Sequence, residues 1–108
     1  MALKAQLKDV EAQLVVIGER VRIARVRRCW TAAELAERVG VERRTISRLE
    51  HGDAGVRTGV LFSVVWVLGL WETAVGLADP ARDEAGLALE RRRQPKRARK
   101  RSDVELDF

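Results

Sequence analysis

The chain is poor in the residues on which most catalytic and metal sites depend. Its 108 residues include one cysteine, Cys29, one histidine, His51, and no tyrosine. A lone cysteine excludes a disulfide within the chain, and a single histidine leaves no cluster of imidazole and thiolate ligands for a metal. The sequence also has no phosphate-cradling glycine loop and no nucleophile–base arrangement. We therefore predict no enzymatic activity, no metal and no cofactor.

Long apolar runs and targeting signals are missing as well. The longest run, residues 60–71, is interrupted by Ser63 and is shorter than the roughly 18 to 20 residues that span a bilayer. The first residues lack the basic-then-apolar pattern of a secretory signal. These features predict a cytoplasmic protein. Cys29, beside Trp30, is expected to be a small packing residue rather than a reactive thiol.

Positive charge is unevenly distributed along the chain. The formal net charge is +5, yet residues 91–101 hold eight Lys or Arg and no acid, and residues 102–108 hold three acids. The thirteen basic and thirteen acidic groups of residues 1–90 therefore cancel. Within this balanced part, positive charge is concentrated between Arg20 and Arg57. A local basic patch, and not the net charge, indicates a polyanionic partner.

Residues 31–52, TAAELAERVGVERRTISRLEHG, have the pattern of two short amphipathic helices joined by a turn. Thr31 and Glu34 have the spacing of a capping box, in which the two residues bond each other's backbone amides. Gly40 follows the apolar positions of the first helix, where a left-handed residue commonly ends a helix. We expect the second helix over residues 42–50.

This second helix carries arginines and hydroxyls on the arc opposite its apolar residues Ile46 and Leu49. Such a helix, placed after a glycine-containing turn, is typical of a helix-turn-helix that enters the DNA major groove. Arginine matches the acceptors of guanine, and Ser or Thr serves bases or phosphates. A solvated helix face is the alternative for the arginines, but the surrounding turn favours DNA contact. The outer arc comprises Arg43, Arg44, Thr45, Ser47 and Arg48.

The string W-T-A-A-E-L-A-E-R-V-G-V-E-R-R-T-I-S-R-L-E-H-G resembles the Cro/repressor-like, or XRE-type, helix-turn-helix family. E-L-A, V-G-V, T-I-S-R-L-E and the closing glycine all stand at the family spacing. The resemblance implies an all-α, five-helix repressor-like domain that binds double-stranded DNA. The motif covers about a fifth of the chain, and the domain around it a little over half.

The resemblance also implies roles for single residues. Arg43, Arg44 and Ser47 match positions that reach base edges, and Arg48 matches one near base or phosphate. Thr31 and His51 match phosphate-contacting positions, and Arg57 in the following loop is a further candidate for a phosphate. The complete expected set is Thr31, Arg43, Arg44, Thr45, Ser47, Arg48, His51 and Arg57.

Two further positions bear on how the motif is held. Arg25 and Glu50 match a structural ion pair that ties the first helix of the domain to the third. Ala32 departs from the family, in which many members have a glutamine that touches a phosphate and supports the recognition helix. Placement on DNA is therefore expected to rest more on Thr31 and the arginines.

The remaining chain divides into three expected parts. Residues 1–16 are an N-terminal arm or short helix, residues 17–78 form the helix-turn-helix domain, and residues 79–108 form a C-terminal extension. Further helices are expected over residues 18–29, from the N-cap Thr58 to Leu68 before Gly69, and from Asp79-Pro80 to about Arg92. Trp30 is expected to cover the core, with stacking on DNA as the less favoured alternative.

The helix expected after Thr58 is apolar nearly all round, so more than one of its sides must be covered. A homodimer would cover part of it, and a two-fold dimer would read a palindromic operator. A wholly intrachain core is the alternative. The residues assigned to the dimer interface are Leu61, Val64, Val65, Leu68 and Trp71.

The C-terminal extension contains two adjoining segments of different character. The basic run of residues 91–101 is interpreted as an arm that binds DNA through its phosphates, with a solubilising tail as the alternative. Residues 102–108, SDVELDF, alternate acidic and apolar side chains. They are either a peptide that docks on a partner or a frayed terminus.

Taken together, these features predict a bacterial transcriptional repressor. The stretch LADPARDEAGLALERRRQPKRARKR resembles HipB-like antitoxins, which implies autorepression and binding of a HipA-type Ser/Thr kinase toxin. One alternative is a stand-alone XRE-type regulator without a toxin. Another is a protein-interaction scaffold that uses the C-terminal peptide, and RNA binding through the basic run is a weaker third.

Overall fold

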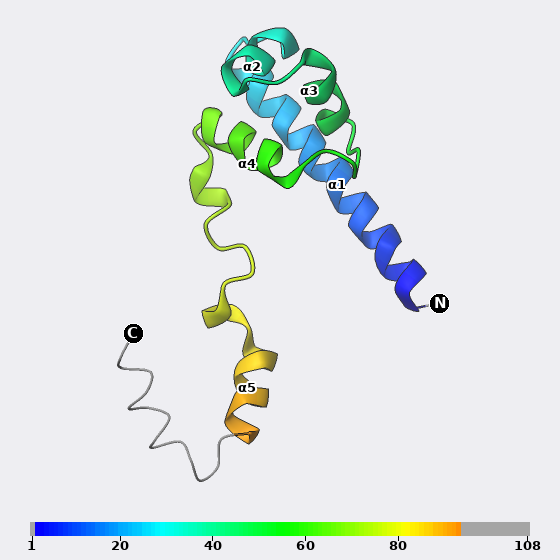
Figure 1. The fold of residues 1–108 in the computed structure, drawn as a ribbon, viewed down its shortest axis with the longest axis vertical. Coiled ribbons are helices and arrows are strands. Elements are labelled where there is room, and N and C mark those ends of the chain that lie inside the picture. Colours follow the sequence, from blue (N-terminus) through cyan, green and yellow to red (C-terminus); the bar gives the residue numbers. More distant parts are fainter. Residues whose placement is uncertain (1, 94–108) are drawn as a thin grey trace. The chain divides into compact units, whose positions relative to one another are not determined.

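The structure, a computed structural model, describes residues 2–93, with side chains from Leu7 onward. Every regular element in this part is helical, which confirms the predicted all-α class. The chain separates into two compact units between Val75 and Gly76. The elements, drawn in Figure 1, are α1 Ala2–Arg27, α2 Ala32–Val39, α3 Arg43–Glu50, α4 Thr58–Val67, η1 Trp71–Thr73, η2 Pro80–Arg82 and α5 Glu84–Arg92, where η marks a 3-10 helix.

The first unit is built around one small core to which α1, α2, α3 and α4 all contribute. α2 packs on α3 and α4, and α3 also packs on the C-terminal half of α1. Ile46 and Leu49 are buried, as their spacing on the second helix of the motif predicts. The buried core consists of Val21, Ala24, Leu35, Ala36, Ile46, Leu49, Val64 and Leu68.

The expected break between an N-terminal arm and the first helix is absent. Residues 2–16, interpreted from sequence as an arm or short helix, are the first turns of a single 26-residue helix, α1. Ala, Leu, Lys, Gln and Glu, which are strong helix formers, dominate its first half. Figure 1 shows these turns extending past the other helices of the unit.

The segment that follows α1 corrects the expectation for Cys29. The helix ends at Arg27, so Cys29 is not its last residue. Cys29 has a positive φ of 58° and is exposed, so it does not pack in the core as the sequence suggested. The backbone turn places Trp30, half-buried, against the core instead. The Arg38 guanidinium lies 4.2 Å from the centre of the Trp30 ring, a cation–π contact.

Helix α4 forms despite its β-branched sequence because the domain gives it a surface to pack on. It begins with Thr58 as its first residue and not, as predicted, its N-cap, and Gly69, with a φ of 77°, follows its end. Val64 and Leu68 are 0% and 2% exposed within the protomer. They therefore offer no surface to a second subunit, and their assignment to the dimer interface is wrong.

In the second unit, the helix expected from Asp79 to Arg92 is interrupted. Asp79 caps only the short η2, through its side chain and the Ala81 amide. α5 starts afresh at Glu84, where the Asp83 carboxylate accepts from the Gly86 amide, and it ends at Arg92 as predicted. Two Asp caps so close in sequence make two short helices of one expected helix. The basic run beyond Arg93 and the terminus 102–108 lie outside the described residues.

Candidate nucleic-acid interface

Local hydrogen bonds close both ends of α2 and so fix where the turn to α3 begins. At the start of α2, Thr31 Oγ1 accepts from the Glu34 amide at 3.0 Å, and Glu34 Oε1 accepts from the Thr31 amide at 2.7 Å. The predicted capping box is therefore present. At the end of α2, Gly40 has a φ of 90°, and its amide donates to the Ala36 carbonyl. Both ends of α2 are thus closed as the sequence predicted.

The C-terminal end of α3 is seated directly on the backbone of α1. A Cβ atom at Gly18 would lie 2.5 Å from the Leu49 carbonyl oxygen and 2.6 Å from that of Glu50. Any larger residue at position 18 would therefore push the two helices apart. This close approach was not predicted from the sequence, in which Gly18 gave no signal beyond lying at the expected start of a helix.

An ion pair locks the same crossing. Arg25 Nε and Nη2 donate to the two carboxylate oxygens of Glu50 at 2.7 and 3.0 Å, and Arg25 Nη1 donates to the Trp30 carbonyl. The ion pair implied by the family resemblance is therefore present. Both side chains are mostly buried. The hydrogen bond to Glu50 raises the pKa of Arg25 above its usual value, so the guanidinium stays charged.

Helix α3 presents its polar arc to solvent while its apolar side is buried. Arg43 and Arg44, in its first turn, are exposed, and Thr45 and Ser47 are half-buried. No hydrogen bond or ion pair to another described residue engages the Arg43 or Arg44 side chain, so all their donors are available to a ligand. Two unpaired guanidinium groups on one exposed arc suit a polyanion with acceptor groups.

Arg48 differs from its neighbours because it has an internal partner. Its Nε donates to Asp53 Oδ2 at 2.7 Å, and Asp53 Oδ1 accepts from the Gly55 amide at 2.6 Å. The hydrogen bond with Arg48, followed by that from Gly55, lowers the pKa of Asp53. Arg48 is therefore oriented by the loop after α3. The sequence reasoning missed Asp53, although the Asp-x-Gly spacing is typical of a side-chain-stabilised turn.

The three residues expected at phosphates lie on different elements and have different capacities. The Thr31 hydroxyl accepts from the Glu34 amide within the capping box, and its proton can be donated either to the Glu34 carboxylate or to a phosphate. His51 Nδ1 lies 2.7 Å from the Ser47 carbonyl, which only accepts, so Nδ1 carries the proton. Arg57 is exposed at the N-cap of α4.

Ala32 occupies the position at which the resembling family has a glutamine. It is half-buried and packs against the core at the start of α2. A methyl group cannot donate to a phosphate. The exposed donors at this end of the motif are therefore those of Thr31 and of the first turn of α3.

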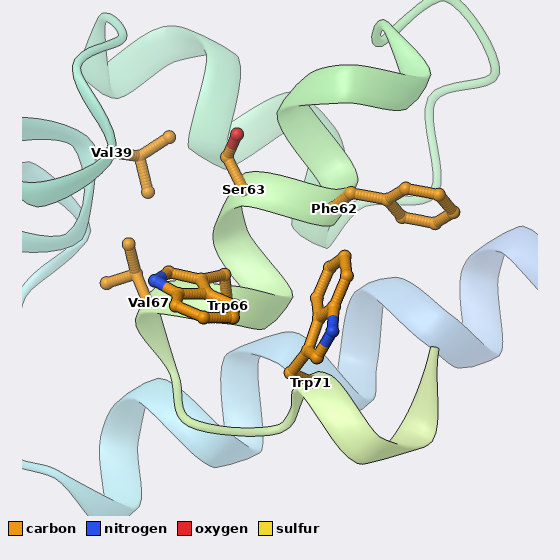
Figure 2. Close-up of a pocket in the computed structure, with 6 residues that line it drawn as sticks. All are labelled: Val39, Phe62, Ser63, Trp66, Val67 and Trp71. Atoms are coloured by element: carbon orange, nitrogen blue, oxygen red, sulfur yellow. The ribbon is translucent and has the colours of Figure 1, made fainter. Parts of the chain in front are cut away.

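A second surface of the same unit is apolar. Phe62, Trp66 and Trp71 meet edge to face, with ring centroids 6.1 Å apart for Phe62–Trp71 and 5.4 Å apart for Trp66–Trp71. Figure 2 shows these rings with Val39, Ser63 and Val67 around a cleft of about 390 Å³. Trp66 is 63% exposed, although tryptophan is highly buried on average. None of the cleft residues is charged.

Two negative findings concern residues 2–93. No helix there has both the length and the apolarity needed to cross a membrane. Nor do three or more His, Cys, Asp or Glu side chains gather in this range in a way that would hold a metal ion.

Comparison with known protein families identifies the domain. The model of a helix-turn-helix domain family matches residues 16–75, which is more than half of the chain. The matched range spans the core, the capped α2, the exposed arc of α3 and the aromatic cleft. A search of curated proteins finds no match.

Proposed function

Because the chain belongs to the helix-turn-helix domain family, we propose that it represses transcription by binding a specific operator sequence through α3. The observation that carries this proposal is the pair of exposed, unpaired guanidinium groups of Arg43 and Arg44 on α3, a helix whose C-terminal end is held against α1 by the Arg25–Glu50 pair. A helix docked in the major groove presents its N-terminal residues to base edges. Repression would follow from occupancy of the operator.

The roles within this interface follow from each residue's surroundings. Arg43, Arg44 and Ser47 would read base edges, because they lie on the outer arc of α3. Arg48 is already held by Asp53 at 2.7 Å, so we assign it to a phosphate beside the groove. The set proposed for phosphates is completed by Thr31, His51 and Arg57, and Thr45 would assist from the first turn of α3.

The test of base reading is the variant Arg44→Ala. Loss of one bidentate arginine is expected to weaken operator binding by about 1–3 kcal/mol and to relax specificity at one base pair. Binding of the operator and of random duplexes is measured by fluorescence anisotropy at one salt concentration. Glu37→Ala, on the exposed side of α2, is the matched control. Equal losses on operator and random DNA would show that Arg44 contacts only phosphates.

We further propose that the protein binds its operator as a homodimer. One α3 spans only a few base pairs, whereas a two-fold dimer reads a palindrome with half-sites a helical turn apart. Val64 and Leu68 are buried in the protomer and cannot form the contact between subunits. We therefore assign that contact to the exposed rings of Trp66 and Trp71, beside the half-buried Leu61 and Val65. An uncharged surface suits a two-fold contact, in which residues near the axis meet their own copies.

Sedimentation velocity tests the proposed dimer. Trp66→Gln combined with Trp71→Gln is expected to weaken self-association, because it places polar groups on the cleft of Figure 2. A palindromic duplex would then be bound more weakly and a single half-site as before. A wild-type protein that sediments as a monomer at tens of micromolar would rule the dimer out.

The narrower proposal is that this repressor is an antitoxin of a HipA-type kinase. It is supported by the resemblance of residues 77–101 to HipB-like antitoxins and by the acidic-apolar terminus 102–108. A pull-down with the product of the neighbouring gene, with full-length protein and with residues 102–108 removed, tests it. A neighbour that is not kinase-like, or that is not retained by either form, would favour a stand-alone regulator.

A further inference from the structure

The first half of α1 carries an apolar stripe that continues a buried seam. Apolar residues recur along α1 at alternating steps of four and three, which is the repeat of a coiled coil. The members of this repeat are Leu3, Leu7, Val10, Leu14, Ile17, Val21 and Ala24. The last three pack in or against the domain core. The seam therefore has a partner at its C-terminal end only.

The N-terminal end of the stripe is uncovered. Leu7 and Val10 are 51% and 52% exposed, and Leu14 is half-buried where the helix meets the rest of the unit. Leu3 falls on the same stripe by helical register. Figure 1 shows that this part of α1 extends past the other helices of its unit. Apolar residues at both seam positions over several turns mark a face that pairs with another helix.

We propose that residues 3–14 of α1 pair antiparallel with the same residues of a second copy of this chain. In an antiparallel coiled coil, a residue at heptad position a of one helix meets a residue at position d of the other. In α1, Leu7 and Leu14 occupy a positions, and Leu3 and Val10 occupy d positions. The register that centres residues 3–14 brings Leu7 of each copy against Val10 of the other. It also brings Leu3 of each copy against Leu14 of the other. The stripe is thereby covered over about 16 Å of helix, up to the point where the domain core begins.

The flanking charges favour this partner and this direction. Lys4 and Glu11 border the same side of the stripe by helical register. In the antiparallel register Lys4 of each copy faces Glu11 of the other, so two symmetric ion pairs form. A parallel pair would set Glu11 against the uncharged Gln6 and would form no ion pair. The helix is thus complementary to itself when reversed.

The other faces of the segment argue against a membrane surface as the partner. Lys4 and Lys8 are balanced by Asp9 and Glu11. Helices that lie on membranes are rich in Lys and Arg on their polar face, because anionic lipids attract them. A second protein helix needs no such excess.

Folding of the domain prepares the segment for pairing. A free helix of this length is marginal in water. Here, however, α1 continues into the core and is held there by the Arg25–Glu50 ion pair. Little conformational entropy is therefore lost when two copies associate, so a short interface suffices for a stable pair. The stripe shares no residue with the α3 arc or with the aromatic cleft. Pairing through it is therefore compatible with DNA binding by both copies, a consequence that rests on the proposed function.

Self-association of the full chain is the first test. Leu7→Gln combined with Val10→Gln keeps helix-forming residues and removes the apolar stripe. The matched control, Ala5→Gln combined with Ala12→Gln, alters positions on the opposite face of α1. The stripe variant is expected to lose one association step in sedimentation velocity, with a dissociation constant raised roughly a hundredfold or more. The control should associate as wild type, and equal association of all three proteins overturns the proposal.

Binding to a short half-site duplex is measured with the same variants. The stripe variant is expected to bind it as tightly as wild type, which also shows that the variant is folded. If no protein binds the half-site, including the wild type, the proposed function is rejected, but the proposal that α1 pairs with a second copy still stands.

The direction of pairing is tested by cross-linking in a Cys29→Ser background, since Cys29 is exposed. Leu7→Cys and Val10→Cys proteins are oxidised separately and as a mixture. Antiparallel pairing predicts a disulfide chiefly between the two different proteins in the mixture. Disulfides chiefly within each separate protein would indicate parallel pairing and overturn the proposal, as would no cross-link at all.

A charge exchange supplies an independent check. Glu11→Lys alone is expected to weaken association, because repulsion between two lysines then replaces each of the two ion pairs. Combining it with Lys4→Glu should restore association. Failure of the second change to restore it would contradict the facing of Lys4 and Glu11.

Discussion

At the scale of single residues, the placement of α3 and Arg48 depends on residues outside the exposed arc. Gly18 admits the carbonyl groups of Leu49 and Glu50, and Asp53 orients Arg48. Gly18 thus sets how closely α3 packs on α1, and Asp53 sets the direction of the Arg48 side chain. Their role is positional, and their loss should be detectable in stability before it is detectable in DNA binding.

We predict that Gly18→Ala destabilises the protein by about 1–3 kcal/mol, because the new methyl group meets backbone that cannot move aside. Urea unfolding measures the change. Gly59→Ala in α4 is the control, since a Cβ there meets nothing within 4 Å and alanine favours a helix. That control should be neutral or slightly stabilising. A Gly18→Ala protein as stable as wild type would refute the close approach.

The capping box predicts a pH effect. Hydrogen bonds from the Thr31 backbone and side chain lower the pKa of Glu34 below its usual 4.5. The carboxylate therefore contributes stability that is complete above pH 4.5 and is lost as pH falls through the lowered value. Glu34→Gln should remove this part of the acid destabilisation, as measured by thermal unfolding from acidic to neutral pH. Glu37→Gln, outside the capping box, should leave it in place.

At the scale of elements, the contact between α1 and α3 holds the candidate DNA-binding helix α3 in place. Apolar packing around Ile46 and Leu49 supplies the area, and the Arg25–Glu50 pair fixes the angle. An apolar contact alone would allow α3 to turn about its axis, whereas a bidentate ion pair does not.

Arg25→Met is expected to cost about 3 kcal/mol or more, because it leaves the Glu50 carboxylate mostly buried without its partner. Arg25→Met combined with Glu50→Gln should recover part of that loss. The exposed Arg22–Glu19 pair provides the comparison, and Arg22→Met should have a much smaller effect on stability because solvent screens that pair. Equal effects of the two single changes in chemical denaturation would contradict this ranking.

Sequence patterns predicted the elements that rest on local rules. Thr31, Glu34 and Gly40 specify α2 because caps are determined by residues within a few positions of one another. The patterns failed where tertiary contacts decide. The sequence around Gly18 carries no sign of the close approach, because that approach depends on how α3 packs against α1. Likewise, the burial of Val64 and Leu68 depends on which helices pack against α4. The length of α1 was missed because its first turns look polar without the coiled-coil register.

At the scale of the whole molecule, the net positive charge comes from the C-terminal run of residues 91–101 and not from the domain. Residues 1–90 carry no net charge, so attraction of the domain to DNA is local to α3 and its surroundings. The basic run of residues 91–101 would add a sequence-independent contribution of the kind that depends steeply on salt.

Removal of residues 91–101 should therefore flatten the dependence of log affinity on log salt, by about 0.9 for each phosphate that the run neutralises. Operator preference over random DNA should change little, since that preference rests on α3. A chain without residues 102–108 is the control and should keep the wild-type slope. An unchanged slope after removal of 91–101 would show that the run does not bind DNA.

The aromatic cleft has a consequence for how the protein can be observed. The chain has three tryptophans and no tyrosine, so its near-ultraviolet emission comes almost wholly from Trp30, Trp66 and Trp71. Trp30 lies against Arg38, and the other two rings stack edge to face in the cleft. A water-exposed Trp66 emits at long wavelength. Burial of that ring by a second subunit would shift the emission to the blue, giving a label-free optical signal of assembly.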